Sequence, residues 1–156
     1  ADLSEILCSA IRSVGNTVHN GGVYVAMEGP AFSTKAESMN YRSWGASVIG
    51  MTALPEAKLA REAEMCYVTL ACATDYDVWH ETEDDVSVEM IVQNLQRNVT
   101  TSKKILQLLA PMLEKERRIC SCGDALQNAI ITDPASIPAR TRQRLDAIVK
   151  KYLGTG

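Results

Sequence analysis

Two carboxylates spaced two residues apart, Asp75 and Asp77, follow a strongly apolar run and could carry acid–base chemistry. If the extended backbone of that run continues, both side chains point to the same side. Two close carboxylates in a partly dry pocket raise the pKa of at least one of them, and such a group can give a proton to a leaving group at neutral pH. The alternative is a solvated acidic loop, because four more acidic residues follow by position 85.

Two further candidate binding residues stand where apolar runs end. Phe32, the sole phenylalanine, follows Gly29-Pro30 in a loop, where its ring could stack on a planar ligand. The alternative is a loop residue packed on the core. Thr52 follows an apolar strand and begins a helix, so its hydroxyl and the neighbouring N–H groups could hold an anion. A plain helix N-cap is the alternative for Thr52.

The elements that must position these residues alternate between strand and helix. Short apolar runs bounded by turn residues predict strands over 23–27, 46–51 and 65–73, and the last two read as buried strands. This alternation indicates an α/β layered sheet. Right-handed crossovers would bring the ends of the three strands to one edge, outside which ligands bind. We therefore expect three loops to meet there, over 28–34, 50–55 and 74–86.

Helical spacing of apolar residues and helix-end signals predict five helices. Ser33 or Thr34 caps the second, Gly45 ends it, and Ser87 caps the fourth, which ends near Pro111. The predicted helices cover 3–14, 34–44, 52–64, 88–111 and 138–153.

Composition limits the partners. The net charge of −3 leaves no basic footprint, so we expect no nucleic-acid partner. No apolar run approaches the roughly 20 residues that a membrane span needs. No basic and apolar leader opens the chain, which favours a cytoplasmic protein. The chain begins with Ala1 and not with Met, which fits a processed product, an engineered piece or a part of a longer polypeptide.

The cysteines favour neither a secreted framework nor a metal site. Their odd number, five, and their irregular spacing argue against a secreted disulfide framework. Cys120 and Cys122 form a recognisable pair, but His19 and His80 lie far away in sequence, so a zinc site has poor support. Small buried hydrophobes plus a chance pair, or a disulfide or redox role for Cys120 and Cys122, remain the alternatives.

Three ordered segments together resemble the trimeric purine nucleoside phosphorylase family. They are GVYVAMEGPAFSTKAES over 22–38, WGASVIGMTALPEA over 44–57 and ATDYDVW over 73–79. The third looks like the methylthioadenosine phosphorylase branch of that family. The similarity is clear from about Val23 to Leu109 and faint beyond Pro111.

The resemblance implies a mixed central sheet with flanking helices, of the phosphorylase/hydrolase type. Residues 1–156 would form the C-terminal part of a single nucleoside phosphorylase domain. The implied reaction is phosphorolysis of 5′-methylthioadenosine to adenine and 5-methylthioribose 1-phosphate. Inorganic phosphate is the co-substrate, and no metal or organic cofactor is expected.

By this resemblance, Phe32 lies against the purine, while Asp75 and Asp77 address the adenine N7 and 6-amino group. Asp75 is the catalytic candidate that donates or relays a proton to N7. Enzymes selective for 6-oxopurines carry Glu at the position of Ser33 and Asn at that of Asp75. A 6-amino group needs an acceptor, which a carboxylate supplies, so adenine is favoured.

The remaining implied contacts concern the sugar and the phosphate. The Met51 region contacts the ribose, and Thr52 reaches the phosphate. Val88 and Ile91 would line the 5′-methylthio pocket, although both positions also fit an ordinary core stripe.

The same family builds most of its phosphate site, and residues lent across a trimer interface, from an N-terminal half that is not recognisable here. We therefore expect that half as an obligatory partner, in a homotrimer of complete subunits. Two alternatives stay open. One is a phosphorylase or hydrolase for adenosine or other 6-aminopurine nucleosides, and the other is a non-catalytic nucleoside-binding fragment.

Overall fold

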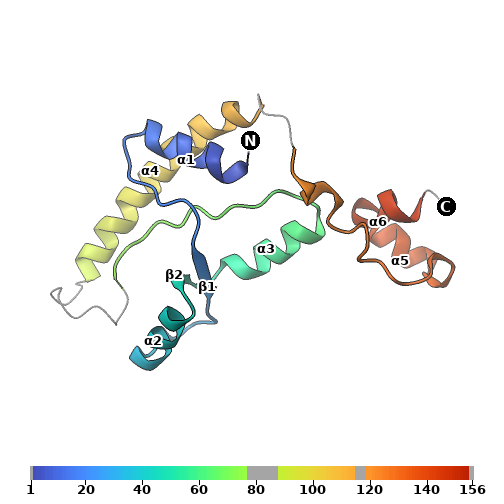
Figure 1. Cartoon of the computed structure of the whole chain (residues 1–156), viewed down its shortest axis with the longest axis horizontal. Helices are drawn as coiled ribbons and strands as arrows, with labels where there is room; N and C mark the ends of the chain where they lie inside the picture. Colours follow the sequence, from blue (N-terminus) through green and yellow to red (C-terminus); the bar gives the residue numbers. More distant parts are fainter. Residues whose placement is uncertain (1, 77–87, 115–118, 155–156) are drawn as a thin grey trace. The chain divides into compact units, whose positions relative to one another are not determined.

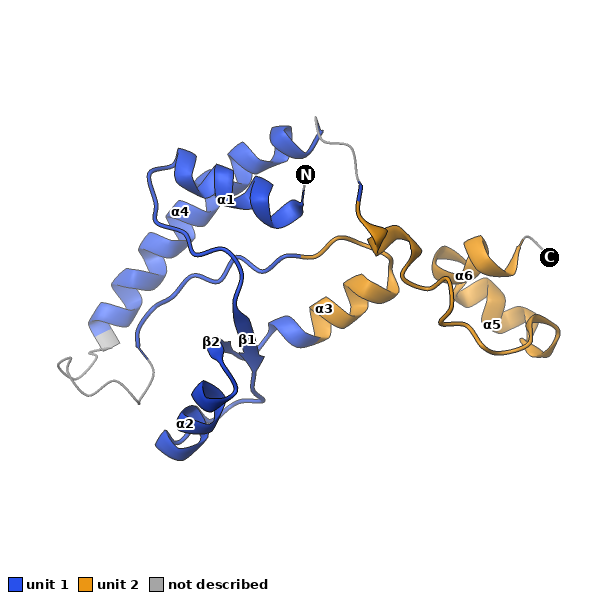
Figure 2. Cartoon of the chain, in the orientation of Figure 1, with its two compact units in different colours: residues 1–54, 68–119 blue, residues 55–67, 120–156 orange. Residues whose placement is uncertain are grey.

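The computed structural model describes residues 2–76, 88–114 and 119–154. The chain divides into two compact units, which are coloured separately in Figure 2. The first unit comprises residues 1–54 and 68–119, and the second comprises residues 55–67 and 120–156. Each unit is described by itself below.

The core of the first unit lies between two helices, α1 (Leu3–Ser13) and α4 (Val88–Glu114) (Figure 1). The Asp2 carboxylate caps α1 by accepting a hydrogen bond from the Ser4 N–H at 3.1 Å. Apolar residues three and four positions apart then form one stripe, which packs on the middle and end of α4. The buried residues of this core are Ile6, Leu7, Ala10, Ile11, Ile105 and Leu109.

A parallel strand pair, β1 (Val23–Ala26) and β2 (Ala46–Gly50), forms the sheet of the described residues. Val25 pairs with Ile49 in this register. The helix α2 (Lys35–Ser43) connects the two strands, as a parallel pair requires. Gly45, with φ of +80°, turns the chain out of α2 into β2, a conformation that favours glycine. The predicted strand–helix–strand order is confirmed here.

The predicted strand over 65–73 is not formed. This segment runs without strand pairing, and Met65 is 60% exposed. A strand needs a neighbour that satisfies its backbone N–H and C=O groups, and the sheet of the described residues holds only β1 and β2. Val68 and Leu70 instead pack against the α1–α4 core.

Three smaller predictions also need correction. The strand β2 is not buried, since Ser47 and Val48 are exposed and its other residues are only half-buried. Pro111 does not end α4, which continues to Glu114, because a missing N–H near a helix end removes only one hydrogen bond. The predicted helix over 138–153 is interrupted at Leu145, whose φ of −101° and ψ of 9° leave the helical range.

The second unit contains most of α3 (Ala53–Glu62), two 3₁₀ turns and two short helices. The turns are η1 (Ser121–Asp124) and η2 (Pro134–Ser136), and the helices are α5 (Ala139–Arg144) and α6 (Asp146–Leu153). Within the ranges that the structure describes, no helix combines the length and the apolarity that crossing a bilayer requires.

Candidate active site

The loop after β1 presents Phe32 and anchors the residues beside it. Phe32 is 86% exposed, so its ring is not packed on the core. Ser33 points inward instead, where its hydroxyl shares a hydrogen bond of 2.9 Å with the buried hydroxyl of Ser38. The alternative of a core-packed Phe32 is therefore excluded. The hydrogen bond between Ser33 and Ser38 fixes the loop next to Phe32.

Thr34, and not Ser33, caps α2. The Glu37 N–H donates to the Thr34 hydroxyl oxygen at 3.3 Å, and the Thr34 N–H donates to the Glu37 carboxylate at 2.7 Å. This reciprocal pair is a capping box. The hydrogen bonds from the backbone and side chain of Thr34 hold the pKa of Glu37 below its ordinary value. The box fixes the chain two residues after Phe32.

The end of β2 lies against the loop that follows β1. The Met27 N–H donates to the Gly50 carbonyl at 2.9 Å and so continues the strand ladder. A Cβ on Gly29 would stand 3.0 Å from the Met51 sulfur, which leaves room there for glycine but crowds a larger residue. Met51 and Thr52 are exposed, and Thr52 directly precedes α3. The structure therefore brings two of the three predicted loops together.

Asp75 belongs to a segment that α4 holds. Its carboxylate accepts a hydrogen bond of 2.8 Å from the Thr74 hydroxyl. The Asn94 side-chain amide donates to the Thr74 carbonyl at 2.8 Å, and the Asn98 amide donates to the Ala73 carbonyl at 2.9 Å. Sequence reasoning missed both asparagines. Their spacing of four on one helix face was the available signal.

The other predicted pocket residues have different outcomes. Ile91 is half-buried on α4, one turn before Asn94 and on the same face. Val88 is the first residue of α4. Asp77 lies outside the described residues, so its pairing with Asp75 stays a prediction. The meeting of Asp75 with the two loops at the strand ends stays a prediction as well.

Within the described ranges, potential metal ligands gather at one place, and it is not at the strand ends. It is the group Cys66, Cys120 and Cys122 in the second unit.

The residues around Phe32, Thr52 and Asp75 thus offer an aromatic face, a hydroxyl at a helix start and a carboxylate. These groups suit an organic ligand that carries a flat ring and an anion.

A parallel strand pair joined by a helix, with exposed polar and aromatic residues beyond the strand ends, is typical of α/β proteins, in which ligands bind outside the carboxyl ends of the strands. The family model of the phosphorylase superfamily matches residues 1–110. The chain belongs to the phosphorylase superfamily. The predicted family resemblance and fold class are confirmed.

Curated relatives give a consistent set of names. The chain is 56% identical to the S-methyl-5′-thioadenosine phosphorylase of Geobacter sulfurreducens, over 98% of this chain and 53% of that protein. It is 48% identical to the protein of the same name from Gloeobacter violaceus, over 97% of this chain and 52% of the relative. The chain thus spans about half the length of the curated relatives that it matches.

Solved structures agree with the sequence relatives. A methylthioadenosine phosphorylase from an antarctic soil metagenomic library superposes with a TM-score of 0.85 at 38% identity, over 94% of this chain and 52% of that chain. A methylthioadenosine phosphorylase from Schistosoma mansoni, in complex with adenine, gives a TM-score of 0.68 at 27% identity, over 80% of this chain and 49% of that chain.

Proposed function

We propose that this chain supplies the base- and ribose-binding half of an enzyme that cleaves 5′-methylthioadenosine with phosphate. The observation that carries the proposal is the 56% identity, along 98% of this chain, to a protein named S-methyl-5′-thioadenosine phosphorylase. The geometry of the described residues supports it, because the groups it displays match the parts of such a substrate.

The base side of the proposed site uses Phe32 and Asp75. An exposed phenyl ring on an anchored loop is available to stack on a purine. The backbone carbonyls of the two residues before Asp75 accept hydrogen bonds from side chains on α4. The backbone that carries the Asp75 carboxylate is therefore held in place. In the proposed reaction Asp75 donates or relays a proton to N7, and Asp77 is assigned to the adenine 6-amino group.

The sugar side uses Met51 and Thr52, which end the neighbouring strand. Thr52 stands at the start of α3, where backbone N–H groups favour an anion, so we assign it to phosphate. The C–N glycosidic bond breaks with its electron pair going to the base, and positive charge develops on the ribose. A phosphate oxygen then forms the new bond to the anomeric carbon. Adenine and 5-methylthioribose 1-phosphate leave, and no metal or organic cofactor takes part.

An N-terminal companion segment is part of the proposal. The chain spans about half of its relatives, and large apolar side chains such as Leu59, Met65 and Leu106 are more than half exposed. Large apolar side chains left this exposed are typical of surface that other protein covers. We propose that the companion covers it, supplies most of the phosphate site, and completes the subunit of a trimer in the cytoplasm.

Adenosine is the second candidate substrate. Some of the similar Schistosoma mansoni structures are of an adenosine/methylthioadenosine phosphorylase, one of them in complex with methylthioadenosine, at 26% identity and a TM-score of 0.67. Adenosine differs from 5′-methylthioadenosine only at the 5′ position. Val88 and Ile91, which we assign to the 5′ pocket, would decide between the two.

The test measures adenine release by the chain co-expressed with the N-terminal segment of the Geobacter sulfurreducens relative. We expect the two to co-purify and to release adenine from 5′-methylthioadenosine only when phosphate is present. Sulfate at equal ionic strength is the matched control. Release without phosphate would identify a hydrolase, faster cleavage of adenosine would favour the second substrate, and a co-purified complex with no release would contradict the proposed function.

A further inference from the structure

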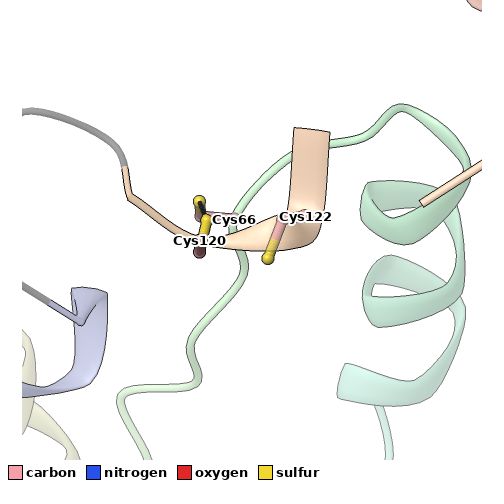
Figure 3. Close-up of side chains that lie close together, drawn as sticks. All are labelled: Cys66, Cys120 and Cys122. Carbon is pink, nitrogen blue, oxygen red and sulfur yellow. Dashed lines mark hydrogen bonds between the residues drawn. The ribbon is translucent and has the colours of Figure 1, made fainter. Parts of the chain in front are cut away.

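Three cysteine thiols from distant parts of the sequence lie together in the second unit (Figure 3). The sulfur atoms of Cys66 and Cys120 are 3.2 Å apart, and all three sulfurs, including that of Cys122, lie within 4.8 Å of one another. Cys120 is exposed and the other two are half-buried, so a small ion can reach the group from solvent. The sequence pair of Cys120 and Cys122 thereby acquires a third member.

Hydrogen bonds around Glu64 hold the two segments that carry these cysteines. The Leu126 N–H donates to the Glu64 carboxylate at 3.1 Å, and the Tyr152 hydroxyl donates to the same oxygen. Glu64 is two residues before Cys66, and Leu126 is four residues after Cys122. The Glu64 side chain is only 15% exposed, so these bonds are partly shielded from water.

Lys151 on α6 reinforces the same turn. Its ammonium group donates to the Gly123 carbonyl at 2.5 Å and to the Asp124 carboxylate at 2.7 Å, and it lies 3.3 Å from Glu64. The hydrogen bond to Asp124 is the main reason that the pKa of Lys151 is raised. These contacts tie the 3₁₀ turn η1, which carries Cys122, to α6.

The sulfur separations suit a shared metal ion. Two thiolates that bind one tetrahedral Zn²⁺ at about 2.3 Å have sulfurs about 3.8 Å apart. The Cys66 and Cys120 sulfurs are 3.2 Å apart, and no pair of the three sulfurs is separated by more than 4.8 Å. Side-chain rotations that move each sulfur by about 1 Å or less would therefore bring every pair to the zinc-bound separation, a shift on the order of a thermal displacement. A disulfide needs a larger approach by one pair, to about 2.05 Å, and leaves the third thiol without a role.

We propose that Cys66, Cys120 and Cys122 form a three-thiolate site for a soft, thiophilic metal ion, with Zn²⁺ as the representative. Thiolate ligands select zinc and Cu⁺ over magnesium or calcium. A water or an added thiol takes the fourth position on zinc. Because the ligands must be deprotonated, binding releases protons and strengthens as the pH rises. The ion joins the end of α3 to the turn that opens the C-terminal segment.

The test is a titration of Zn²⁺ into all 156 residues of the chain, with its cysteines reduced, in competition with a chromophoric chelator. We expect one ion per chain, and a loss of affinity of at least about 10-fold for Cys66→Ser, Cys120→Ser or Cys122→Ser. Cys72→Ser is the matched control, because Cys72 is exposed and its thiol pairs with Ser102 outside the group. Co²⁺ in place of Zn²⁺ should give sulfur-to-metal charge-transfer absorption that each of the three variants reduces.

Alkylation of the unmutated chain keeps the proposal falsifiable if a variant misfolds. Zn²⁺ should protect all three cysteines together from iodoacetamide, while Cys72 stays reactive. Unchanged affinity in Cys66→Ser would overturn the proposal. Protection of Cys120 and Cys122 alone would also overturn it. So would a chain that forms a Cys66–Cys120 disulfide in air and, once fully reduced, binds no zinc.

Discussion

The Asn94 side-chain amide donates a hydrogen bond of 2.8 Å to the backbone carbonyl of Thr74, the residue directly before Asp75. The two residues are twenty positions apart and belong to different segments of the first unit. Asn98, one helical turn later, holds the Ala73 carbonyl in the same way. Since residues 65–74 have no strand partner, these side chains satisfy carbonyls that a sheet would otherwise pair.

Replacing both asparagines should loosen the segment before Asp75. Each neutral hydrogen bond contributes about 0.5–1.5 kcal/mol, so Asn94→Ala with Asn98→Ala should raise local opening by roughly 10-fold or more. Hydrogen exchange of residues 70–76 measures this. Gln96→Ala is the control on the same helix, because Gln96 is exposed and its side chain takes no part in these bonds. Equal exchange in the double variant and the control would show that α4 does not hold the segment.

Asp75→Asn tests the proposed proton transfer in the assembled enzyme. An amide cannot donate the proton of a carboxylic acid, so turnover should fall by about 10²–10⁴-fold. Thr74→Val removes the hydroxyl that donates to Asp75 and should cost only about 3- to 10-fold. Asp146→Asn, at an exposed carboxylate of the second unit, serves as the control and should leave the rate unchanged. A rate for Asp75→Asn equal to that of the control would remove Asp75 from the mechanism.

Local signals in the sequence predicted the elements that need no distant partner. Thr34 and Glu37 are three residues apart and form their capping box whatever surrounds them, so the start of α2 was predictable. Gly45 ended the same helix for an equally local reason. The sequence placed Phe32 in a loop but left its exposure open between a free ring and a core-packed one.

Features that depend on distant segments could not be predicted in the same way. The apolar run from Met65 to Ala73 has the composition of a buried strand, yet pairing depends on neighbours that the described chain does not provide. Cys66 and Cys120 are fifty-four residues apart, and no sequence-spacing rule predicts that their sulfurs lie 3.2 Å apart. The spacing of Asn94 and Asn98 puts both on one helix face, but nothing in the sequence places that face beside Thr74.

The acid titration of Glu64 should be visible at the Leu126 amide. The hydrogen bond from Tyr152 is the main reason that the pKa of Glu64 lies below its ordinary value of 4.5. A lowered folded-state pKa means that the carboxylate stabilises the fold fully above about pH 4.5 and loses this effect as the pH falls through the lower, folded-state value. We expect the Leu126 amide shift to titrate with a midpoint below 4.5 and the second unit to open more readily in acid.

Glu64→Gln is the control for that titration, since it removes the ionising group and should abolish the shift change at Leu126. A midpoint at or above 4.5 in the unmutated chain would contradict the prediction. Persistent titration in Glu64→Gln would assign the change to another carboxylate, such as Asp124.

Ile105 and Leu106 are neighbours on α4 with opposite environments. Substitutions at these two positions therefore distinguish stability that comes from core packing from stability that comes from coverage by another protein segment. Ile105 is 2% exposed within the α1–α4 core, whereas Leu106 is 56% exposed. Ile105→Ala should therefore lower the free energy of unfolding by about 2–5 kcal/mol, measured by denaturant titration. Leu106→Ala should change it by less than about 0.5 kcal/mol in the chain alone. In the complex with the N-terminal companion, Leu106→Ala should become destabilising, because burial of a leucine side chain contributes about 1.5–3 kcal/mol. If Leu106→Ala stays neutral there while Ile105→Ala remains costly, the companion does not cover this face of α4.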